Sequence, residues 1–151
     1  MNIEEAIKGR YRNDYHKGLI NLIYTVNQLN YDFMRHLKKH KLTKPQYNIL
    51  RVLRGFREQG PCSLGFIKER MLDKSSDVSR IVDKLYAKGL VTRCESTADR
   101  RRKAIEISVK GLTLLEAMGD CDTKADSLLS NLTPEEVATL NKLLDKIRVK
   151  P

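Results

Sequence analysis

The sequence contains little of the chemistry that builds metal centres and disulfide frameworks. It has three cysteines, at positions 62, 94 and 121, and no two of them are spaced as CxxC. Such a scattered, odd-numbered set predicts neither a disulfide framework nor a structural zinc site. His36 and His40 have the i, i+4 spacing of some metal ligands, but the lysines around them oppose a cation. We therefore expect no metal and no other cofactor.

Long apolar runs and catalytic motifs are missing as well. No stretch approaches the roughly 18–20 apolar residues that a membrane-spanning helix needs, and residues 1–12 lack the apolar core of a signal peptide. A cytoplasmic location without a membrane partner is expected. The sequence also has no glycine-rich phosphate loop, no serine nucleophile elbow and no carboxylate pair in an apolar setting. We therefore do not expect an enzyme.

Positive charge is abundant and concentrated in one region. The chain of 151 residues has 29 lysines and arginines against 19 acidic residues, a formal net charge of +10. Residues 74–103 carry nine basic and four acidic side chains, so half of the net charge lies in thirty residues. This concentration favours a polyanionic partner. The alternative interpretation is a solvated basic surface.

The same region has the pattern of a helix-turn-helix. A short helix over residues 66–72 is followed by a polar turn at 73–76 and a second helix over 77–88. Apolar residues recur every three or four positions in the second helix, and Gly89 suits a left-handed residue that ends it. They are Val78, Ile81, Val82 and Leu85. The opposite face is small, polar or charged, as insertion into a major groove requires.

The candidate DNA contacts of this helix are hydroxyl and basic side chains, which address bases and phosphates. They are Ser75, Ser76, Ser79, Arg80 and Lys84. An alternative role for Ser75 or Ser76 is to cap the helix, and a cap also presents amide groups to phosphate.

A β-hairpin follows the second helix. Residues 91–95 and 104–108 alternate in polarity and contain β-branched residues, and an arginine-rich loop of about eight residues joins them. Residues 62–64 are a candidate edge strand for the same sheet. Arg93, at the base of the hairpin, is a candidate structural residue that packs its stem. The region as a whole therefore predicts a winged helix-turn-helix.

Amphipathic helices are predicted on both sides of this region. Residues 11–41 keep helical spacing over a length that exceeds a typical globular helix, so part of it is expected to pack outside its own core. Thr43, Pro45 and Gln46 predict the start of the next helix. Ser108 is expected to cap a long helix with apolar positions from Leu112 to Leu129, and Thr133, Pro134 and Glu136 predict a last helix.

Four segments carry a resemblance to a known family. They are residues 42–50, 76–85, 89–93 and 99–111. In order and content they resemble the MarR family of bacterial transcription regulators, over nearly the whole chain. The resemblance implies a mainly α fold with a small β-hairpin wing. It places a winged helix-turn-helix domain at residues 42–108, between an N-terminal dimerisation helix at 1–41 and C-terminal dimerisation helices at 109–151.

The resemblance also implies a function. It describes a homodimer that binds double-stranded DNA sequence-specifically and represses from a pseudo-palindromic operator. In the wing, Asp99 matches the acid that holds Arg101 extended for a minor groove, with a simple turn-forming role as the alternative. The neighbouring basic residues are expected to touch phosphates or solvent; they are Arg100, Arg102 and Lys103.

Release by a small aromatic effector is a further expectation. In a dimer of this shape the effector would bind between the dimerisation stem and the winged helix, lined by Phe33, Leu37, Tyr47 and Leu50, although a plain core requires the same apolar residues. The family's peroxide sensors use a cysteine in the first helix, which this chain lacks, so Cys121 is only a secondary redox candidate. Two other functions remain open, a winged helix that binds only protein and a binder of structured RNA.

Overall fold

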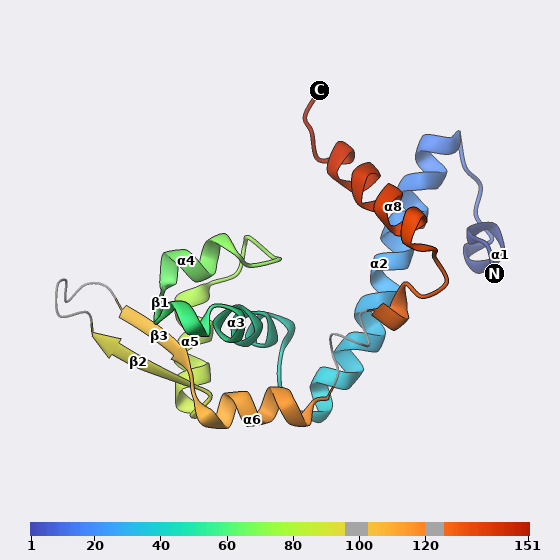
Figure 1. The fold of residues 1–151 in the computed structure, drawn as a ribbon. Helices are drawn as coiled ribbons and strands as arrows, with labels where there is room; N and C mark the ends of the chain where they lie inside the picture. The colour runs from blue at the N-terminus through green and yellow to red at the C-terminus, as the bar shows by residue number, and fades with distance from the viewer. Residues whose placement is uncertain (96–102, 120–125) are drawn as a thin grey trace. The chain divides into compact units, whose positions relative to one another are not determined.

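The computed structural model describes residues 1–95, 103–119 and 126–151. They form two compact units, one of residues 1–115 and one of residues 116–151. The first unit contains most of the helices and a small antiparallel sheet (Figure 1).

The N-terminal part of the first unit consists of a short and a long helix. Helix α1 spans Ile3–Ile7 and was not expected from the sequence. Helix α2 spans Asp14–Lys39, which confirms a helix within residues 11–41. It starts late because the Asn13 side chain accepts a hydrogen bond from the His16 amide at 2.9 Å and so caps the helix. It stops early because Lys41 adopts a left-handed conformation, with φ of +56°.

Part of the apolar stripe of α2 remains exposed. Leu37 in the last turn is buried, and the Phe33 ring meets the Tyr47 ring edge-on at 5.2 Å. Further back, Leu19, Ile23 and Val26 keep 56%, 49% and 46% of their surfaces exposed. The sequence prediction that part of this helix packs outside its own core is consistent with these exposures.

Helix α3, Lys44–Gly55, forms the centre of the core. Its predicted start is confirmed: Thr43 and Gln46 make both bonds of a capping box, and Pro45 lies in the first turn, where a missing amide is harmless. Ile49 and Leu50 are fully buried. A 3-10 turn, η1, follows at Arg57–Gln59.

The sheet consists of β1 (Cys62–Ser63), β2 (Val91–Glu95) and β3 (Lys103–Ile107), in the order β1-β3-β2. Cys62 pairs with Ile105, and Arg93 pairs with Ile105 from the other side. The predicted hairpin and edge strand are confirmed, except that Leu64 belongs to the next helix. Ile105 is completely buried at the centre of the sheet.

The helix-turn-helix is formed by α4, Leu64–Glu69, and α5, Val78–Ala87. Helix α4 begins and ends earlier than residues 66–72, so the predicted four-residue turn is wrong: residues 70–77 separate the two helices. The Arg70 guanidinium lies 3.5 Å from the Phe66 ring centroid and donates to the Phe66 carbonyl at 3.1 Å. The Arg70 side chain thus satisfies a carbonyl group in the last turn of α4, where the helix ends.

Helix α6, Val109–Ala117, corrects the prediction of one long helix from Ser108 to Leu129. The Ser108 hydroxyl accepts from the Gly111 amide at 3.0 Å, as a cap should. The helix ends because Gly119 turns left-handed, with φ of +63°. The apolar spacing therefore continues beyond the end of the helix. In the second unit, α8 spans Pro134–Ile147 behind the predicted capping box of Thr133 and Glu136.

Candidate nucleic-acid interface

The polar residues of α5 lie on one open face. Ser79, Arg80 and Lys84 are exposed, and Ser76 just before the helix is half-buried. The apolar stripe on the other side is held in the core, with Leu85 completely buried. The ten-residue helix thus presents a side whose hydroxyl and cationic groups can reach base edges and phosphates.

Asp77 caps α5, so neither Ser75 nor Ser76 does. Its carboxylate oxygen accepts from the Arg80 amide at 3.2 Å. The alternative prediction from the sequence, that Ser75 or Ser76 caps this helix, is therefore wrong. An acidic cap also complements the positive end of the helix dipole.

Ser75 instead belongs to the turn before α5. Its hydroxyl and its amide both donate to the same Asp73 oxygen, at 2.6 and 2.9 Å. The hydroxyl bond is the main reason that the pKa of the Asp73 carboxyl lies below its ordinary value. Because the Ser75 proton is donated to Asp73, its oxygen is left as an acceptor in this geometry.

Arg93 connects the base of the wing to α5. Its guanidinium is 2.6 Å from the Asp83 carboxylate and 3.9 Å from the centre of the Tyr86 ring. Arg93 thus has a structural role, and the contacts that give it this role are made by its guanidinium. Its partners, Asp83 and Tyr86, were not predicted from the sequence; both lie on α5 and offer the charge and the ring that attract arginine.

The tip of the wing lies outside the described residues. Asp99, Arg100, Arg101 and Arg102 fall there, and Lys103 is described only as the first residue of β3. Their roles on DNA remain predictions.

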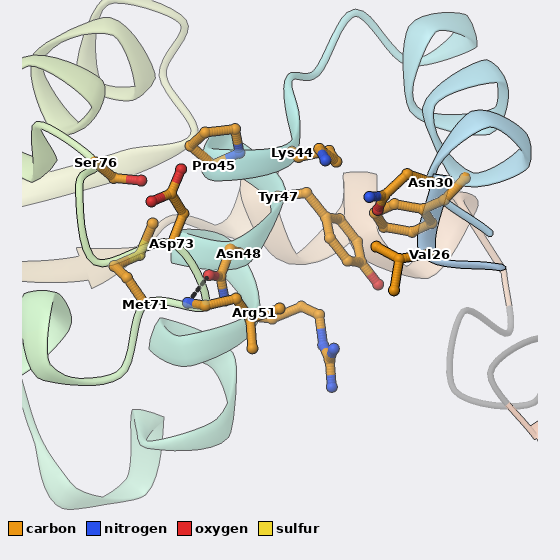
Figure 2. A pocket seen from close by; sticks show the side chains of 12 residues that line it. Val26, Asn30, Lys44, Pro45, Tyr47, Asn48, Arg51, Met71, Asp73 and Ser76 are labelled. Carbon is orange, nitrogen blue, oxygen red and sulfur yellow. Dashed lines mark hydrogen bonds between the residues drawn. The ribbon is translucent and has the colours of Figure 1, made fainter. Parts of the chain in front are cut away.

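A pocket of about 470 Å³ lies beside the helix-turn-helix. Figure 2 shows side chains from the second half of α2, from the first two turns of α3 and from the turn before α5 around it. Its lining residues are Val26, Asn30, Phe33, Lys44, Pro45, Tyr47, Asn48, Arg51, Met71, Leu72, Asp73 and Ser76. Of the four residues expected at an effector site, Phe33 and Tyr47 line it. Leu37 and Leu50 lie in the adjoining core, almost without exposed surface.

The pocket combines aromatic surface with positive charge. Phe33 and Tyr47 supply rings, Lys44 and Arg51 supply cations, and Asp73 is the acidic residue among the lining side chains. A hydrogen bond connects α3, on one side of the pocket, to the segment between α4 and α5: the Leu72 amide donates to Asn48 Oδ1 at 2.8 Å (Figure 2). A molecule in the pocket therefore contacts the segment that leads into α5.

The cysteines and histidines that the structure describes form no assembled site. Cys62 is buried in β1, and desolvation raises the pKa of its thiol; Cys94 is exposed on β2. Cys121 lies outside the described residues. The His36 and His40 rings meet edge-on at 5.4 Å. Within the described ranges, no three His, Cys, Asp or Glu residues are placed to hold a metal ion.

In residues 1–95, 103–119 and 126–151, no helix has the length and apolar content needed to cross a bilayer.

The chain is similar to known transcription regulators. Residues 42–103 match the model of the MarR family. The chain is similar to the HTH-type transcriptional regulator MhqR of Bacillus subtilis, with 30% identity over 132 residues that cover 87% of this chain and 89% of that protein.

Two solved structures are similar over nearly their whole length. BpsR of Bordetella bronchiseptica, whose DNA binding is described as regulated by 6-hydroxynicotinic acid, has a TM-score of 0.74 at 26% identity, covering 95% of this chain and all of that one. A cysteine-to-serine mutant of MarR from E. coli, complexed with operator DNA, has a TM-score of 0.68 at 26% identity, with 97% of each chain covered.

Proposed function

The chain belongs to the MarR family of transcription regulators, and from this we propose that it is a homodimeric repressor of a pseudo-palindromic duplex DNA operator. The observation that carries the proposal is the open polar face of α5, with Ser79, Arg80 and Lys84 exposed on a helix whose other side is buried. A helix that reads a DNA groove needs one exposed polar side for the DNA and one buried apolar side that holds it to the protein.

Two copies would place two such helices on one face of the duplex. The exposed apolar residues of α2 support pairing, as does α8, on which no residue is buried within the chain. Patches of this kind on helices mark protein contacts. Half-sites of the operator would then lie about one helical turn, roughly 34–36 Å, apart.

A gel-shift comparison separates this function from its rivals. We expect tight binding to a duplex DNA enriched from a random-sequence pool, and weak binding to double-stranded RNA of the same sequence. Arg80→Ala should weaken DNA binding, by about 1–3 kcal/mol if the guanidinium reads a guanine, whereas Arg57→Ala, at an exposed position in η1, serves as the charge-matched control. Equal affinity for RNA would favour the RNA function, and no binding to either would favour a protein-interaction module.

The pocket beside the helix-turn-helix supports a second part of the proposal, that a small aromatic acid releases the protein from DNA. Its rings offer stacking surface, and Lys44 and Arg51 offer charge for a carboxylate. A ligand that binds better to the DNA-free arrangement must weaken operator binding by the same factor.

Titration of 6-hydroxynicotinic acid and salicylate into the free protein and into the protein–DNA complex tests this regulation. We expect binding to the free protein and weaker operator affinity in its presence, both diminished in Tyr47→Ala. A compound that binds the free protein but leaves operator affinity unchanged has no differential affinity for the two states, and control through this pocket is then excluded for it.

A further inference from the structure

The C-terminal end of α5 is fixed by two lysines outside the proposed DNA-contacting face. Lys88, which follows the last turn of α5, donates its ammonium to the Lys41 carbonyl at 2.7 Å and to Gln46 Oε1 at 3.3 Å. Lys110, in the first turn of α6, donates to the Lys88 carbonyl at 2.8 Å. One continuous set of bonds therefore joins the start of α6, the end of α5 and the corner between α2 and α3.

The acceptors of Lys88 are not ordinary surface groups. Lys41 is a non-glycine residue at a φ of +56°, a conformation that is uncommon without local support. Gln46 is only 5% exposed, and its Oε1 also accepts from the Thr43 amide at 3.1 Å. Buried amides need all the partners that geometry allows. The Lys88 ammonium thus joins the capping box that starts α3.

The electrostatics also favour these links. The carbonyl ends of α2 and α5 carry partial negative charge, which attracts an ammonium group. Lys110 has the opposite setting, because the first turn of a helix disfavours a cation. The Lys88 carbonyl at the end of α5, which accepts from the Lys110 ammonium, explains why a lysine stands in the first turn of α6.

We propose that Lys88 and Lys110 are positioning residues, which set the angle of α5 against the α2–α3 corner and so the spacing of the two α5 helices of a dimer on DNA. This inference rests on the proposed operator binding. In the proposed complex neither ammonium group touches DNA, because both donate hydrogen bonds within the protein at the C-terminal end of α5, opposite the Asp77 cap.

The test uses Lys88→Met and Lys110→Met, which keep the aliphatic stem and remove the ammonium. Lys38→Met, exposed in the last turn of α2, is the matched control for charge. Each protein is titrated with the duplex enriched by the wild type, and with versions that have one base pair added or removed at the centre.

We expect both variants to bind the original duplex more weakly, by roughly tenfold, and to discriminate less between the three spacings. The slope of log affinity against log salt should stay that of the wild type, since no phosphate contact is lost. Lys88→Arg, which keeps donors at the same place, should restore the spacing preference, and Lys38→Met should behave as wild type.

Two results would overturn the inference while leaving operator binding intact. A salt slope reduced by about one unit identifies a phosphate contact instead. Affinity and spacing preference equal to wild type in both variants show that the links do not position α5. If the wild type enriches no duplex, the proposed operator binding itself fails, which is a distinct outcome.

Discussion

At the scale of single residues, the group of Asp83, Tyr86 and Arg93 links the wing to α5. Arg93 is largely covered, with 28% of its side chain exposed, whereas Asp83 keeps 57%. A pair of this partial exposure contributes about 0.2–1 kcal/mol, and the ring contact contributes about 0.5–1 kcal/mol more. The group also neutralises Asp83 on the face of α5 that we propose contacts DNA.

A double-mutant cycle with Asp83→Asn and Arg93→Met measures this link. Arg93→Met should lower the free energy of unfolding by roughly 1–2 kcal/mol, and the coupling between the two sites should be about 0.5–1 kcal/mol in urea unfolding. Strictly additive effects would mean that the ion pair contributes nothing in solution.

In the wing tip, Arg101→Ala should reduce operator affinity by about 1–3 kcal/mol if the side chain enters a groove. Arg102→Ala should cost less, and by the same amount for every sequence, because a phosphate contact carries no base information. Asp99→Ala should resemble Arg101→Ala although it removes a negative charge. Tighter DNA binding by Asp99→Ala in fluorescence titrations would show that the acid is only repulsive.

The turn before α5 should respond to acid through Asp73. Its lowered pKa means that the ionised form is favoured in the folded chain, so the carboxylate stabilises the turn above the ordinary pKa of 3.8. That contribution is lost as the pH falls through the lowered value. Ser75→Ala removes the largest cause and should raise the pKa of Asp73 in an NMR titration of its carboxyl carbon. An unchanged pKa would place the cause elsewhere.

At the scale of elements, local chemistry determined what the sequence could predict. Capping boxes at Thr43 and Thr133 are short-range signals, and both start helices where expected. The end of α6 was mispredicted because apolar spacing continues past Ala117 while Gly119 turns left-handed. Asp77 was missed as a cap because two serines stand beside it. The partners of Arg93 and Lys88 depend on tertiary contacts, which periodicity does not report.

Gly111 allows α6 to meet the chain ahead of β2. A Cβ at this position would lie 2.3 Å from the Leu90 carbonyl oxygen and 2.7 Å from Ile107. Gly111→Ala should therefore destabilise the fold by about 1–3 kcal/mol, because backbone must move. Gly65→Ala in α4 is the control: its Cβ would meet nothing within 4 Å, and it should be neutral or stabilising by up to about 1 kcal/mol. Equal melting temperatures for the two variants would contradict this difference.

At the scale of the whole molecule, the uncovered helices predict a dimer in solution without DNA. Ile23→Lys places a charge in the exposed apolar stripe of α2 and should yield monomer or aggregate, whereas Gln28→Lys on the polar side should not. Deletion of residues 133–151 should give insoluble protein for the same reason. Light scattering provides the readout, and a well-behaved wild-type monomer at micromolar concentration would refute the assembly.

Because the bonds of Lys88 and Lys110 hold the C-terminal end of α5, a small tilt about that end moves the N-terminal end of the helix furthest. Ten residues of helix extend about 15 Å, so a tilt of about 6° around Lys88 displaces the Asp77 end by roughly 1.5 Å. Such a displacement is enough to lose a well-aligned bidentate hydrogen bond to a base. On a two-fold operator the same small tilt acts at both half-sites. If α5 reads operator bases as proposed, a rotation smaller than the scatter among ordinary helix-packing angles is therefore enough to weaken DNA binding.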